Sequence, residues 1–123
     1  MGENMQTKFH SDLKEYLDAY AHLIYDITTT FPTNEQFGLT SQLRRAAISV
    51  VLNYTEGYAR MRKAILKNFI EISYGSLKES LYLVEFSYKR KFMTKEQYIQ
   101  ATELANIIAK MLWGMLKKLQ VSS

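Results

Sequence analysis

The stretch LTSQLRRAAISVVLNYTEGYAR, from Leu39 to Arg60, decides the fold of this chain of 123 residues. Its apolar residues recur every three or four positions and no proline interrupts them, which predicts one helix over 39–60. The residues expected to face the core are Leu39, Leu43, Ala46, Val50 and Gly57. A row of polar residues, named here the polar ladder, runs beside that face and consists of Gln42, Arg45, Ser49, Asn53, Glu56 and Arg60. Neighbouring members of the ladder are three or four residues apart, so their side chains can touch.

The composition is typical of a folded helical domain. Hydrophobic residues make up 47% of the chain and charged residues 23%, which argues against disorder. A single proline and five glycines leave long uninterrupted stretches, and this favours helices over a turn-rich β fold. No apolar run is long enough to cross a bilayer, no signal-peptide pattern follows Met1, and cysteine is absent. We therefore expect a cytoplasmic protein that makes no contact with a membrane.

Further helices are expected on both sides of this stretch, over 11–30, 65–89 and 95–119. The first begins with Ser11 as its N-cap and ends before Pro32. The last opens with a capping box formed by Thr94 and Gln97. Short connections between successive helices favour antiparallel neighbours. The sequence therefore predicts an all-α, single-domain, antiparallel up-down-up-down four-helix bundle over 1–123.

Two apolar stripes run along the helix predicted over 65–89, and at 100° per residue they lie about 140° apart. The first stripe contains Ile65, Phe69, Ile72, Ser76 and Leu83, and the second contains Ile70, Tyr74, Leu77, Leu81, Val84 and Tyr88. Because a bundle helix usually turns one arc to the core, two stripes favour a second packing partner, most simply another copy of the chain. A single wide arc that contacts both neighbouring helices is the alternative. The predicted oligomer interface combines the second stripe with Ile48, Val51 and Leu52.

Partners for the polar ladder follow from hairpin symmetry. If the second and third helices fold back at the link between them, facing residues have numbers that sum to about 125. Ser49 then faces Ser76, and Arg45 faces Glu79. Gly75 and Ser76 are small, so we expect the two backbones to approach closely there. We hypothesise that Arg45 and Glu79 form a sheltered ion pair that fixes the helix register, the alternative being a partly exposed network of little energetic weight.

The ladder also carries a family pattern: Leu-x-x-Gln-x-x-Arg-Ala, then Asn-x-x-Glu-Gly, a following Arg, and Gly-Ser-x-x-Glu in the next helix. Its positions here are Leu39, Gln42, Arg45, Ala46, Asn53, Glu56, Gly57, Arg60, Gly75, Ser76 and Glu79. Over roughly 25–119 the chain resembles the four-helix-bundle proteins encoded by intervening sequences in bacterial 23S rRNA genes. Departures from the pattern occur at Tyr54, Thr55, Arg62 and Tyr74.

The resemblance implies a compact bundle that forms a homo-oligomer, with pentameric, barrel-like rings. Similar bundles include the accessory variability protein of diversity-generating retroelements, a basic ring that works with a reverse transcriptase and nucleic acid. The motif residues of the family look architectural rather than catalytic.

Signals for catalysis are weak. Bundle di-iron sites use Glu-x-x-His pairs, and no such pair occurs here, nor does a glycine-rich phosphate loop. The histidines are His10 and His22, a poor set for a metal without cysteine. Glu56 and Glu79 are poor acid/base candidates, because nearby arginines are expected to keep both ionised. We therefore expect a non-enzymatic protein with no cofactor and no metal.

Basic residues gather at both predicted ends of the bundle, and the net charge of the chain is +4. The candidate nucleic-acid site consists of Arg60, Arg62, Lys63, Lys67, Lys117 and Lys118, with Tyr58 nearby for stacking. The opposite end carries Lys89, Arg90, Lys91 and Lys95. A ring would repeat either cluster and multiply weak phosphate contacts, although cations also suit helix C-termini for reasons of stability alone.

The leading functional hypothesis is therefore binding of RNA or DNA by a homo-oligomer. The alternatives are an adaptor that binds a protein partner, for example as an accessory subunit of a reverse transcriptase, and a scaffold with no nucleic-acid role.

Overall fold

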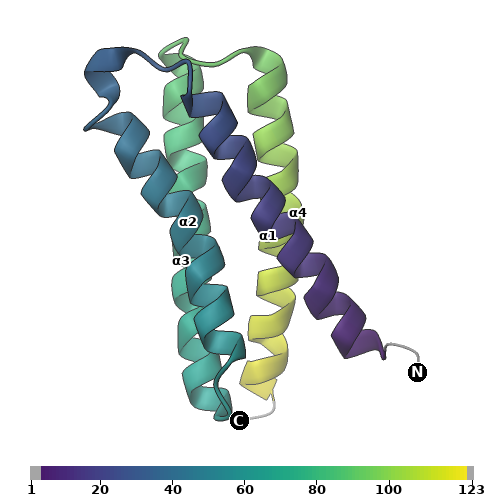
Figure 1. Ribbon diagram of the computed structural model, residues 1–123. Coiled ribbons are helices and arrows are strands. Elements are labelled where there is room, and N and C mark those ends of the chain that lie inside the picture. Colours follow the sequence, from purple (N-terminus) through teal and green to yellow (C-terminus); the bar gives the residue numbers. More distant parts are fainter. Residues whose placement is uncertain (1–3, 122–123) are drawn as a thin grey trace.

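The computed structural model describes residues 4–121 and confirms the all-α prediction (Figure 1). Its elements are α1 (Met5–Thr28), the short 3-10 helix η1 (Thr33–Glu35), α2 (Leu39–Tyr58), α3 (Lys63–Lys89) and α4 (Lys95–Val121). Within residues 4–121 there is no strand, and none of the helices combines the length and apolarity that crossing a membrane requires.

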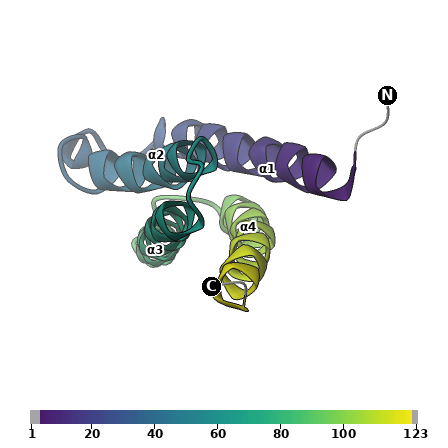
Figure 2. The ribbon, with the colours of Figure 1, turned by 90° about the horizontal axis from the view of Figure 1, so that it is seen from below.

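The four long helices form one antiparallel bundle. α2 packs against α1 and α3, and α4 packs against α3 and α1, so the helices follow one another around the core. Neighbours in sequence run in opposite directions (Figure 1), as the up-down-up-down prediction requires. Seen from below, α1 and α2 lie in one layer and α3 and α4 in a second (Figure 2). The N-terminal part of α1 leans away from the other three helices (Figure 1).

Capping residues determine where two of the helices begin. At α4 the predicted capping box is confirmed: Gln97 N donates to Thr94 Oγ1 at 3.1 Å, and Thr94 N donates to Gln97 Oε1 at 2.9 Å. At α1 the prediction of Ser11 as N-cap is wrong. The helix begins at Met5, because the side chain of Asn4 accepts a hydrogen bond from Thr7 N at 2.7 Å and caps the helix there.

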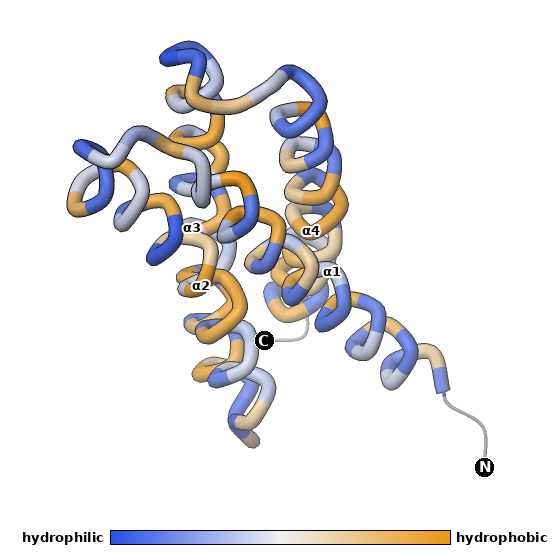
Figure 3. Tube along the Cα trace, turned by 45° about the horizontal axis from the view of Figure 1, so that its top comes forward, coloured by the Kyte–Doolittle hydropathy of each residue, from blue (hydrophilic) through white to orange (hydrophobic). Residues whose placement is uncertain are grey.

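The inward face of α3 corrects the two-stripe prediction. Apolar residues recur along all four helices (Figure 3), but on α3 the second stripe is the one that enters the core. Ile70, Leu77 and Val84 are fully buried within one chain, so their assignment to an oligomer interface is wrong. In the first stripe, Ile65 and Ile72 remain 36% and 44% exposed. The predicted interface residues that pack on the core as partly buried side chains are Val51, Tyr74, Leu81 and Tyr88.

Three buried serines lie on the inward arc of α3, and two of them bond other helices. Ser73, Ser80 and Ser87 recur every seven residues beside the second stripe, and all are fully buried. The hydroxyl of Ser73 donates to the carbonyl of Val50 on α2 at 2.6 Å. Ser80 Oγ lies 2.7 Å from the hydroxyl of Tyr20 on α1, and burial raises the pKa of that tyrosine to about 12. The inward arc of α3 thus comprises the second stripe and the serines, which leaves the first stripe at the edge.

Candidate functional site

Gly57 allows α2 and α3 to approach closely near the link between them. A Cβ atom at this position would lie 2.7 Å from the Cβ of Phe69 and 3.4 Å from the carbonyl oxygen of Leu66. Gly75, by contrast, has no atom within 4 Å of where its Cβ would be. Of the two small residues expected to allow a close approach, Gly75 faces open space and contributes nothing, whereas Ser76 does meet α2; the tight glycine contact is at Gly57.

The middle of the polar ladder is joined to α3 by hydrogen bonds. The predicted contact of Ser49 with Ser76 is confirmed, because their hydroxyl oxygens are 2.8 Å apart. Asn53 Nδ2 donates to the carbonyl oxygen and to the hydroxyl of Ser49, each at 2.9 Å. These partly buried side chains satisfy one another where the two helices meet, so this part of the ladder is structural.

The two ends of the ladder remain in solvent. Arg45 and Glu79 are both exposed and form no ion pair within residues 4–121, so the hypothesis of a sheltered pair is wrong. The free-energy cost of removing two charges from water exceeds the energy of their attraction unless the geometry is very favourable. This explains why both side chains stay exposed to solvent. At the other end, Arg60 pairs with Glu56 on the surface, and its guanidinium lies 5.5 Å from the ring centroid of Phe69.

An open groove between α2 and α3 contains much of this network, and it is lined by Gln42, Arg45, Ser49, Ser76, Glu79 and Tyr82. Several large apolar side chains on the same two helices stay exposed: Leu52 at 60%, Ile72 at 44%, Tyr82 at 64% and Phe86 at 42%. A surface that mixes neutral polar groups, one charge of each sign and exposed apolar side chains is suited to contact with protein.

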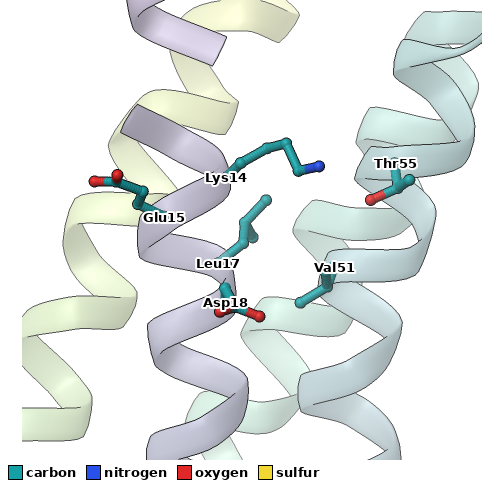
Figure 4. A pocket seen from close by; sticks show the side chains of 6 residues that line it. All are labelled: Lys14, Glu15, Leu17, Asp18, Val51 and Thr55. Carbon is teal, nitrogen blue, oxygen red and sulfur yellow. The ribbon is translucent and has the colours of Figure 1, made fainter. Parts of the chain in front are cut away.

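A second hollow lies between α1 and α2 (Figure 4) and is lined by Lys14, Glu15, Leu17, Asp18, Val51 and Thr55. The side chains of Leu17 and Val51 point into it from the two helices, whereas Glu15 points away. Val51 therefore lines this hollow beside α1 of its own chain. Charges of both signs line the hollow, with no favoured sign of ligand.

The basic residues predicted to bind nucleic acid gather at one end of the bundle. The link between α2 and α3 and the C-terminal end of α4 lie at the same end of the bundle (Figure 1). Arg62 and Lys63 are exposed and make no ion pair within residues 4–121. Lys67 Nζ lies 4.0 Å from Glu71 Oε1. Lys117 and Lys118 of α4 are exposed at the same end. This surface, formed by Arg60, Arg62, Lys63, Lys67, Lys117 and Lys118, is called the basic end below.

A cluster of rings at the start of α1 alters the role expected for Tyr58. Its ring stacks on that of His10, with centroids 3.4 Å apart and planes 6° apart, so one of its faces is already covered. His10 Nδ1 lies 2.5 Å from the hydroxyl of Tyr54. Partial burial and, to a smaller extent, the charge of Lys14 lower the pKa of His10. This histidine thus has a structural role, and no cluster of His, Asp or Glu suited to a metal occurs in residues 4–121.

Comparisons with known proteins agree with this architecture. The model of the family described as 23S rRNA-intervening sequence protein matches residues 12–114. A similar solved structure is a protein of unknown function from the S23 ribosomal protein family of Bacteroides thetaiotaomicron, with a TM-score of 0.82 and 21% identity over 89% of this chain and 98% of that chain. No curated protein matches. Because the family match spans most of the four-helix bundle, the chain belongs to the 23S rRNA-intervening sequence protein family.

Proposed function

We propose that this protein is a non-enzymatic, homo-oligomeric helical bundle that binds RNA or DNA through the basic end. The observation that carries the proposal is the placement of Arg62 and Lys63 at the N-terminus of α3, exposed and without an acidic partner in residues 4–121. The first turn of α3 contains no acidic residue, and Arg62 makes no side-chain capping bond.

Helix stability does not account for these cations. Lysine and arginine suit a helix C-terminus, where the macrodipole is negative, but they oppose the positive dipole at an N-terminus by about 0.3–1 kcal/mol each. At the start of α3 the charges and the unpaired backbone N–H groups have the same sign. Such an end attracts anions, and a phosphate backbone is an anion that makes many contacts at once.

Self-association would repeat the basic end and strengthen binding through avidity. The surface that supports it is the groove between α2 and α3 with its exposed neighbours, Leu52, Ile72, Tyr82 and Phe86. An apolar area of this kind is usually covered in a soluble protein. Light scattering measures the number of copies, for which the resemblance suggests five, and a monomer at micromolar concentration would contradict the assembly.

The test of nucleic-acid binding is fluorescence anisotropy with labelled single-stranded RNA between about 50 and 200 mM salt. The variant that replaces Arg62, Lys63 and Lys67 with Ala should bind at least about tenfold more weakly. Loss of three phosphate contacts should also reduce the slope of log K against log salt by about 2. Absence of binding at low salt would refute the proposal.

The matched control replaces Arg90, Lys91 and Lys95, at the opposite end, with Ala. It removes the same charge, so an equal loss of affinity would show that net charge, and not the basic end, governs binding.

A second candidate function is that of an adaptor for a protein, for example as an accessory subunit of a reverse transcriptase. The exposed apolar side chains beside the groove favour it, because protein interfaces bury such residues. An adaptor would retain its protein partner through nuclease treatment and would lose it when Tyr82 is replaced with Glu.

A further inference from the structure

An aromatic pair lies where α3 and α4 meet, with a partly buried ring from α3 and a half-exposed ring from α4. The rings of Tyr74 and Trp113 have centroids 5.8 Å apart and planes inclined by 39°. Trp113 is 52% exposed, although its neighbour Leu112 is fully buried. Trp113 thus presents a large aromatic surface to solvent beside a second ring, an arrangement that can contact a ligand with a flat face.

Both helices that carry the pair also carry lysines on the same side. Lys78 Nζ lies 5.3 Å from the ring centroid of Tyr74. Lys110 and Lys117 are exposed and stand three residues before and four residues after Trp113, which places them on the same side of α4. The acidic residue nearest in sequence to Tyr74 is Glu71, which is close to Lys67. The face therefore combines flat rings with an excess of positive charge.

The surface next to the rings is open. Gly75 follows Tyr74 and Gly114 follows Trp113, and no atom lies within 4 Å of where a Cβ on either glycine would be. Glycine in the middle of a helix is unfavourable relative to alanine. Both glycines therefore face open space on the turns of α3 and α4 that carry the aromatic pair, and no side chain at these positions crowds the surface there.

We propose that Trp113, held in place by Tyr74, forms a stacking platform for unpaired bases of single-stranded nucleic acid, with Lys78, Lys110 and Lys117 contacting the phosphates. This inference rests on the proposed function and names its substrate class. A ring can stack on any base whose face is free, and bases in a duplex are not free, so the platform selects single strands without selecting sequence.

The platform is also continuous with the basic end. Tyr74 lies eleven residues into α3, about 16 Å from its start at 1.5 Å per residue. About five stacked nucleotides at 3.4 Å each span this distance. Lys117 belongs to both surfaces, so a single strand can bind the basic end and reach the rings.

The experiment uses the single tryptophan of the chain, whose fluorescence reports on Trp113 alone. The full chain is titrated with single-stranded oligouridylate, with oligodeoxythymidylate and with an RNA duplex of the same length. We expect both single strands to quench the emission, saturating at the concentration at which anisotropy saturates, and the duplex to quench it far less. Quenching by the duplex equal to that by the single strands would overturn the platform.

Variants test the same point without relying on fluorescence. Trp113→Ala should weaken single-strand binding by about 5- to 150-fold, the range found for removal of one stacking partner, and Trp113→Phe should weaken it less. Tyr16→Ala, which removes a 37% exposed aromatic ring from α1, should leave the affinity unchanged. Circular dichroism checks that each variant keeps its helices.

The platform and the proposed function fail in different ways. If RNA binds and depends on Arg62, Lys63 and Lys67 but the emission is unchanged and Trp113→Ala binds normally, the platform is refuted and nucleic-acid binding stands. If no RNA binds at low salt, both fail. If the emission shifts with protein concentration in the absence of RNA, another copy of the chain covers the rings, and the platform is refuted.

Discussion

Replacement of Gly57 with alanine should destabilise the bundle by about 1–2 kcal/mol. The added methyl group would lie 2.7 Å from the Cβ of Phe69, whereas carbon atoms pack at about 3.5–4.0 Å. A Cβ is fixed to its backbone and cannot rotate away, so α2 and α3 must separate by about 1 Å. Overpacking of this kind costs about 1–3 kcal/mol, and the better helix propensity of alanine returns up to about 1 kcal/mol.

The assay is urea unfolding followed by circular dichroism, at one protein concentration because self-association changes apparent stability. For a chain of this length, a loss of 1–2 kcal/mol corresponds to a fall in Tm of about 4–8 °C.

The matched control is Gly75→Ala, in the middle of α3, where the new methyl group would meet no atom within 4 Å. It gains the same helix propensity without the clash and should stabilise the protein by about 0.5–1 kcal/mol. The two variants should therefore differ by about 2 kcal/mol. A Gly57→Ala protein as stable as the parent, or a Gly75→Ala protein that loses as much, would refute the close-packing argument.

Three further outcomes are expected. Ser80→Ala removes the partner of the buried Tyr20 hydroxyl and should cost about 1–3 kcal/mol in urea unfolding, a loss that Tyr20→Phe in the same background should partly restore. Lys91→Gly should raise Tm by about 2–4 °C, because Lys91 has a φ of 66° at the end of α3, a conformation that favours glycine; an unchanged or lower Tm would contradict this. Stability should fall as the pH rises from about 10 to 12, because the pKa of Tyr20 is raised to about 12 in the folded state and the unfolded chain releases that proton first; in Tyr20→Phe, unfolding midpoints at pH 9 and pH 11 should differ less than in the parent.

The helical periodicity of the sequence is sufficient to predict the four-helix fold. The regular spacing in α2, the capping box at Thr94 and the short links predict the elements and their antiparallel order, because each depends on residues close together in the chain. Hairpin symmetry also placed Ser49 opposite Ser76. The start of α1 was less predictable, since Asn4 and Ser11 are both good caps and only the capping hydrogen bond distinguishes them.

The inward face of α3 could not be predicted from hydropathy alone. Ser73 and Ser80 read as polar residues, but they are buried because Val50 and Tyr20, on other helices, supply their hydrogen-bond partners. Such partners come from residues distant in sequence. Arg45 and Glu79 show a related limit of sequence-based prediction. Hairpin symmetry correctly predicts that both side chains line the same groove, but it does not include the cost of desolvating them, and they form no ion pair in residues 4–121.

The two candidate sites differ in how far the sequence reveals them. The basic end follows from helix direction together with the positions of Arg62 and Lys63. The aromatic pair does not, because the spacing of Tyr74 places it in an apolar stripe and Trp113 is far from it in sequence. Lysines three before and four after the single tryptophan were the available signal.

The seven-residue spacing of the buried serines limits how α3 can move. Sliding α3 along α2 by one turn, about 5.4 Å, would take the hydroxyl of Ser73 away from the Val50 carbonyl and bring an apolar residue there instead. The buried Ser73 hydroxyl would then have no hydrogen-bond partner, and Ile70 or Leu77 would face the Val50 carbonyl. Both changes are unfavourable and oppose the sliding motion. Because Ser80 in the same row also meets the Tyr20 hydroxyl, the serines oppose sliding of α3 along both α2 and α1.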